Sequence, residues 1–75
     1  MSSEHDFSVF EDEGVEFLAD QRSVLTSNPP KYNCYRLSDR KLFYKFCSMV
    51  KEKHKRYATR SEAKFLIPEG SSFNL

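Results

Sequence analysis

The stretch from Ser38 to Tyr57 constrains the fold of this chain most strongly, because it is long, amphipathic and free of glycine and proline. Ser38 is a good helix N-cap, and Asp39 suits the positive end of a helix dipole. At 3.6 residues per turn, one face of about 100° collects Phe43, Phe46, Cys47, Val50, His54 and Tyr57. The pattern predicts an amphipathic helix over 38–57 as the spine of the fold.

A second helix is predicted over about 11–26. The firm stop at Pro29 would end it, and Gly14 would cost it about 1 kcal/mol relative to alanine. Its apolar face would carry Phe17, Leu18, Val24 and Leu25. The competing interpretation is a pair of strands, 7–10 and 15–18, joined by a turn that contains Gly14.

Two shorter elements complete the prediction. Thr59 and Glu62 have the spacing of a capping box, which favours a short helix over 60–67, although a strand competes there because residues 65–67 are a short apolar run. Residues 31–37 fit an extended segment, with Tyr32, Cys34 and Arg36 on one face.

These elements predict a mainly α fold, with a small α+β fold as the alternative, in a single domain over residues 1–75. Residues 1–6 and 70–75 are expected to be flexible tails. The core is expected to bring the long helix against the N-terminal one through Phe43, Phe46, Val50, Tyr57, Phe17, Leu18, Val24 and Leu25.

The charges are sorted along the chain, although the formal net charge is only +1. Residues 1–20 carry seven acids and no lysine or arginine, whereas residues 21–65 carry all twelve basic residues and three acids. A basic half can dock on an anionic surface, and an acidic half can shield it or bind something else. We expect the two halves to touch, either within one chain or in a homodimer.

A basic helix face with nearby tyrosines is the candidate binding site. It comprises Lys41, Lys45, Lys51, Lys55, Arg56, Arg60, Tyr44 and Tyr35. Cations interleaved with aromatic rings suit phosphate contact and base stacking, so the first hypothesis is a small non-catalytic binding or regulatory protein that docks on nucleic acid. An acidic protein surface is the other partner considered, and many lysine-rich helix faces are simply solvated.

The alternative hypothesis is a protein–protein interaction regulator, such as a small inhibitor or adaptor of the kind that viruses encode. It would act through an aromatic surface or through an acidic segment made of Glu11, Asp12, Glu13 and Glu16. Acids in the first turn of a helix are also ordinary partners of the helix dipole.

The sequence carries no enzyme motif, so we expect no catalytic residues and no cofactor. Cys47 and His54 share the predicted helix face, but the spacing of the cysteines and histidines matches no familiar zinc site, and no metal is expected. Residues 1–14 lack the basic start and the apolar core that are typical of a signal peptide, and no apolar run approaches the length of about 20 residues that a membrane-spanning helix needs. We therefore expect an intracellular protein without a membrane partner, in the cytoplasm or the nucleus, with reduced cysteines.

Overall fold

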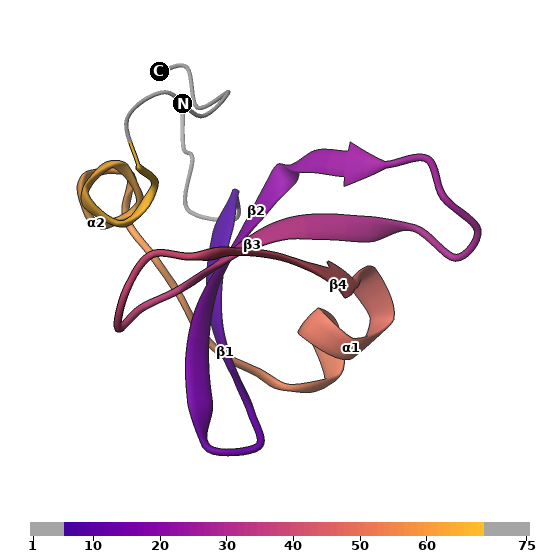
Figure 1. Ribbon diagram of the computed structural model, residues 1–75, viewed down its shortest axis with the longest axis horizontal. Helices are drawn as coiled ribbons and strands as arrows, with labels where there is room; N and C mark the ends of the chain where they lie inside the picture. The colour runs from indigo at the N-terminus through magenta and orange to yellow at the C-terminus, as the bar shows by residue number, and fades with distance from the viewer. Residues whose placement is uncertain (1–5, 69–75) are drawn as a thin grey trace.

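The computed structural model describes residues 6–68, which form five β-strands and two short helices (Figure 1). The chain order is β1 (Phe7–Asp12), β2 (Val15–Leu25), β3 (Lys31–Arg36), β4 (Leu42–Phe46), α1 (Cys47–Glu52), β5 (His54–Tyr57) and α2 (Arg60–Leu66). The strands make one sheet in the order β4-β3-β2-β1-β5, and every neighbouring pair is antiparallel. A four-stranded meander is thus completed by β5, which pairs with β1. The mainly α fold expected from the sequence is wrong.

The N-terminal helix predicted over 11–26 is replaced by the β1–β2 hairpin. Asp12 pairs with Val15, so the loop consists of two residues, Glu13 at φ 53° and Gly14 at φ 80°. Positive φ at both loop residues is the requirement of a type I′ turn, whose twist matches that of the flanking strands. The competing strand pair of the sequence analysis therefore describes this region, and the glycine that weakens a helix is what the turn needs.

The sheet is buried on both faces at its centre, and each face has its own apolar cluster. One cluster packs Phe7, Val9, Leu18 and Tyr35 against α2 and its flanking residues. The other packs Phe10, Phe17, Ala19 and Cys34 against α1. Figure 1 shows the two helices on opposite sides of the sheet. Because neighbouring residues of β1 and β2 enter different clusters, residues 7–10 and 17–20 are buried without interruption, and these strands show no alternation of buried and exposed residues.

The long helix predicted over 38–57 is also wrong. Only its middle, α1, is helical, and the residues before and after it belong to β4 and β5. In β4, Phe43 and Lys45 lie over the Phe17 ring, whereas Tyr44 is exposed. Side chains in β4 therefore alternate with a period of two. The sequence conceals this because four of the five residues of β4 are apolar or aromatic and fit a helical period equally well.

The predicted core is correct only in part. Val50, Phe17 and Leu18 are buried, and Phe43 is half-buried. Four other expected core residues are exposed, because they lie outside both clusters: Phe46, Tyr57, Val24 and Leu25.

Two predictions are confirmed. The segment over 31–37 is extended as β3, and the short C-terminal helix forms as α2. The Thr59 hydroxyl accepts a hydrogen bond from the Glu62 N–H at 3.1 Å, as an N-cap should. The expected tails, 1–6 and 70–75, lie outside the described residues except for Asp6, whose carbonyl accepts from the Gln21 N–H at 2.8 Å.

Candidate functional site

The basic residues nominated from the sequence do not form one surface, because the helix that would align them does not exist. Three of them are bound to carboxylates of the same chain. Lys45 Nζ lies 3.3 Å from Asp12 Oδ2, and Arg56 makes a two-bond contact with Glu62 at 2.9 and 2.8 Å. Lys55 Nζ lies 3.1 Å from Glu11 and 3.0 Å from Glu16. Each of these cations is therefore already paired with a carboxylate of its own chain, which makes it less available to a nucleic acid.

The other nominated residues are scattered. Lys41 is exposed just before β4, Lys51 is exposed on α1, and Arg60 is exposed at the start of α2. Tyr35 is buried beneath α2, so it is not available to a partner, whereas Tyr44 is exposed on β4.

The acidic segment lies at the tip of the β1–β2 hairpin. Three of its carboxylates form ion pairs with lysines that come later in the chain. Asp12 holds Lys45 and, at 4.0 Å, Lys53, while Glu11 and Glu16 share Lys55. The hydrogen bonds that Lys55 donates to Glu16 and Glu11 raise the pKa of its ammonium group. The prediction that the two charge halves touch within one chain is confirmed. Glu13, the fourth acid of the segment, is exposed in the turn.

An uncovered apolar stripe runs along β4. Leu42, Tyr44 and Phe46 are 41%, 54% and 44% exposed, and their shared parity places all three on one face of the sheet. Across the ladder they oppose Tyr35, Asn33 and Lys31 of β3, and Lys31 in turn opposes Leu25 of β2. We call Leu42, Tyr44 and Phe46, together with Lys31 and Leu25, the β4 surface.

The β4 surface continues the face that α2 covers elsewhere. Leu18 and Tyr35 pair across β2 and β3, and both are buried against α2, whereas the next strand position, Leu42, is exposed. Of the β4 surface, only Tyr44 is among the binding residues predicted from the sequence. The alternation of Leu42, Tyr44 and Phe46 indicated the rest, but it was interpreted with a helical period.

Leu42, Tyr44 and Phe46 also direct their backbone N–H groups toward the outer edge of β4, which is an edge strand of the sheet. The Arg36 N–H donates to the Lys41 carbonyl at 2.9 Å, and the Cys47 N–H donates to the Pro30 carbonyl at 3.0 Å. The odd-numbered residues from 41 to 47 therefore direct their backbone groups toward β3, and the even-numbered residues direct theirs away from it. Among residues 6–68, no strand pairs with this outer edge of β4.

The opposite edge of the sheet is different in character. β5 presents charged residues, and Lys55 and Arg56 are held there by Glu11, Glu16 and Glu62. Charged side chains on an edge strand discourage pairing with another chain. The edge of β4 has a single charged residue, Lys45, whose side chain turns inward over Phe17. Of the two edges, β4 is the one suited to receive another strand.

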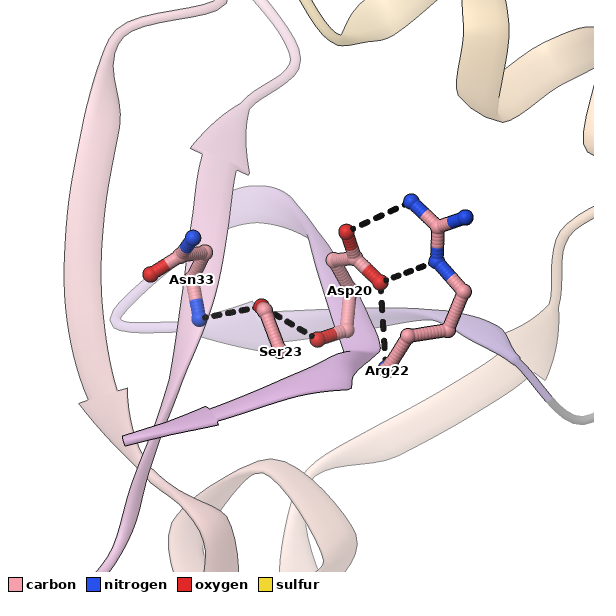
Figure 2. Close-up of polar contacts among 4 residues, drawn as sticks. All are labelled: Asp20, Arg22, Ser23 and Asn33. Carbon is pink, nitrogen blue, oxygen red and sulfur yellow. Dashed lines mark hydrogen bonds and ion pairs between the residues drawn. The ribbon is translucent and has the colours of Figure 1, made fainter. Parts of the chain in front are cut away.

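A group of polar contacts lies between the part of the sheet that α2 covers and the exposed β4 surface (Figure 2). The Asp20 side chain is 7% exposed and accepts bonds from Arg22 Nε at 2.9 Å and Nη2 at 3.0 Å. The bond from Arg22 to Asp20 raises the pKa of the guanidinium group. Ser23 Oγ donates to the Asp20 carbonyl at 2.9 Å and accepts from the Asn33 N–H at 3.4 Å. These bonds hold the irregular part of β2, where its register with β3 shifts.

The groups considered for metal binding or catalysis lie apart. Cys47 is buried at the start of α1, while His54 is exposed on β5 with its ring 4.5 Å from that of Tyr57. Burial raises the pKa of the Cys34 thiol to about 12. Within residues 6–68, no group of three or more His, Cys, Asp or Glu residues is placed to hold a metal ion. A surface hollow beside the hairpin tip includes Glu11 and Glu16, both of which Lys55 already binds.

Neither α1 nor α2 is long and apolar enough to cross a membrane. The chain matches no protein-family model, no curated protein and no solved structure.

Proposed function

We propose that this protein is a small, non-catalytic binding protein that takes up an extended segment of another protein along the outer edge of β4. One observation carries the proposal. The three residues whose backbone groups point away from the sheet, Leu42, Tyr44 and Phe46, also carry the exposed apolar side chains of that strand. A segment that paired with this edge could therefore form main-chain hydrogen bonds and apolar side-chain contacts with the same three residues, as strand addition to a sheet edge requires.

The expected affinity is modest. The three residues offer five free backbone groups, because Phe46 is the N-cap of α1 and its carbonyl accepts the first bond of that helix. Each new hydrogen bond contributes about 0.5–1.5 kcal/mol. Ordering an extended segment costs about 1–2 kcal/mol per residue, so a segment as long as β4 loses at least as much free energy on ordering as its hydrogen bonds contribute. The remaining stabilisation comes from apolar area buried on Leu42, Tyr44 and Phe46. A dissociation constant on the order of micromolar is consistent with this balance.

Nucleic acid is the second candidate, because exposed Tyr44 and Phe46 beside Lys31 could stack bases. Two observations favour protein. The outward backbone groups and Leu42 have no role in base stacking. Three of the nominated cations are also bound to the chain's own carboxylates, which lowers the positive potential that phosphates need.

Selection from a displayed library of random twelve-residue peptides tests the proposal. Peptides selected on the wild type should bind Tyr44→Pro at least tenfold more weakly, because proline removes an outward N–H and leaves the β3–β4 ladder intact. Tyr44→Ala keeps that N–H and should weaken binding by a smaller factor. Phe65→Ala is the matched control, because Phe65 is an exposed aromatic residue on α2, and it should bind as the wild type does.

Circular dichroism of each variant establishes that the sheet is retained. Peptides that bind Tyr44→Pro and Tyr44→Ala as tightly as the wild type would contradict the proposal. So would a random ten-nucleotide single strand that binds at 50 mM salt and is lost in Tyr44→Ala, since that result identifies the β4 surface as a nucleic-acid site.

A further inference from the structure

We infer that the partner segment alternates apolar and acidic residues, with the apolar residues beside Leu42, Tyr44 and Phe46 and the acidic residues on the opposite side of the strand. This inference rests on the proposed strand addition. It concerns the two faces of β4, which differ in chemistry. Directly opposed residues of neighbouring strands project on the same face, so each face of β4 selects every second residue of the segment.

The second face of β4 carries Phe43 and Lys45, and Lys41, which lies just before the strand, shares their parity. Phe43 packs edge-on against Phe17, with ring centroids 5.4 Å apart. Lys41 Nζ and Lys45 Nζ lie 6.0 and 5.5 Å from the Phe43 ring centroid. On this face the added strand would therefore meet an aromatic ring with two ammonium groups near it, whereas its other residues would meet the apolar side chains of Leu42, Tyr44 and Phe46.

Positive charge is in excess on this second face. Asp12 is the single carboxylate shared by Lys45 and Lys53, so this trio carries a net charge of +1. Lys41 and the preceding Arg40 form no ion pair within residues 6–68, and the adjacent Asp39 is bound by Arg36. Carboxylates on the incoming segment would match this charge, while lysines would be repelled.

The same charges argue against a second copy of the chain as the occupant. Antiparallel pairing of β4 with itself about Tyr44 would place Leu42 opposite Phe46, which is favourable. It would also place Phe43 opposite Lys45 twice and bring two sets of Lys41, Lys45 and Lys31 together without any acid on the strand. A strand from another protein that alternates apolar and acidic residues would complement both the apolar face and the positively charged face of β4. A second copy of the chain would complement only the apolar face.

Three synthetic nine-residue peptides test the inference, each with valine at alternate positions and glutamate, asparagine or lysine between. Affinities would be measured by fluorescence anisotropy at low salt. The Val–Glu peptide should bind about tenfold more tightly than Val–Asn, and Val–Lys should bind most weakly. The advantage of Val–Glu should shrink at 0.5 M salt, because exposed charges are then screened.

Charge reversal identifies the responsible side chain. Lys41→Glu should lower the affinity for Val–Glu about tenfold and raise it for Val–Lys. Lys64→Glu makes the same change of charge on α2, away from β4, and should leave the order of the three peptides unchanged.

Equal binding of Val–Glu and Val–Asn would overturn the acidic partner while strand addition stands. Binding of none of the three peptides would overturn both. A dimer of the wild-type chain that is lost in Tyr44→Pro would also overturn the inference, because the occupant would then be a second copy.

Discussion

Asn33 and Tyr44 lie directly opposite each other on β3 and β4. Asn33 Oδ1 is buried and, within the described part of the chain, has no hydrogen-bond partner. Tyr44 is the most exposed residue of the β4 surface. An unsatisfied polar atom thus lies beside the residue at the centre of the proposed docking edge, at the border where the cover of α2 ends.

The buried side-chain oxygen of Asn33 should weaken the fold. A buried polar atom without a partner costs about 1–3 kcal/mol, and valine is preferred in strands. Asn33→Val should therefore raise the free energy of unfolding by about 1 kcal/mol in urea titrations, since the bond from its backbone N–H to Ser23 remains. A lower free energy of unfolding would mean that the side-chain amide does make a stabilising contact.

A substitution in the hairpin turn should change the stability in opposite directions in the observed hairpin and in the helix expected from the sequence. A Cβ at Gly14 would meet nothing within 4 Å, so only the backbone angle, φ +80°, opposes a side chain. Gly14→Ala should lower the stability by about 1 kcal/mol, because alanine disfavours positive φ. In the helix expected from the sequence, the same change would raise the stability by about 1 kcal/mol.

Glu13→Asn is the companion variant, because Glu13 also has positive φ and asparagine tolerates it. It should raise the thermal unfolding temperature. A decrease on Glu13→Asn together with an increase on Gly14→Ala would contradict the type I′ turn.

The elements that the sequence analysis identified correctly are those with local causes. The α2 helix has a hydroxyl cap at Thr59, and β3 alternates between the two faces of the sheet. Both features are encoded within a few residues, so they can be interpreted without knowledge of the fold.

The remaining elements depend on contacts between distant segments. Phe10 and Val9 are adjacent but enter different clusters, so β1 shows no alternation. Lys45 turns inward because Asp12, far away in sequence, and the Phe17 ring receive it. A periodicity argument treats such a lysine as solvent-exposed and therefore assigns β4 to a helix face. The open edge of β4, where we propose that a partner docks, could not be predicted for the same reason, since an edge exists only once the strand order is known.

The Cys34 thiol should be inert in the folded protein. Burial raises its pKa to about 12, so almost none is thiolate at neutral pH. Iodoacetamide at pH 7.5 should modify Cys34 only after urea unfolding, as followed by peptide mass spectrometry. Rapid modification under native conditions would show that β3 is not in the interior.

Two carboxylates should make the fold less stable in acid. The Arg56 hydrogen bond lowers the pKa of Glu62 from 4.5, and the Arg36 hydrogen bond lowers that of Asp39 from 3.8 to about 2. Both pKa values are lower in the folded chain, so the stabilisation is present above the unfolded values and is lost as the pH falls through the folded ones. The urea concentration at the midpoint of unfolding should fall as the pH is lowered from 6 to 2. Glu62→Gln should make this midpoint depend less steeply on pH. An unchanged slope in Glu62→Gln would exclude its contribution.

Hydrogen exchange of the β4 amides, measured by NMR, tests the docking edge most directly. In the protein alone, the amides of Leu42, Tyr44 and Phe46 should exchange rapidly, while those of Phe43 and Lys45 should be protected by the ladder with β3. Saturating Val–Glu peptide should slow the three outward amides and leave the inward pair unchanged. Outward amides that are already protected in the protein alone, or that stay unprotected at saturation, would contradict the claim that β4 receives a partner strand.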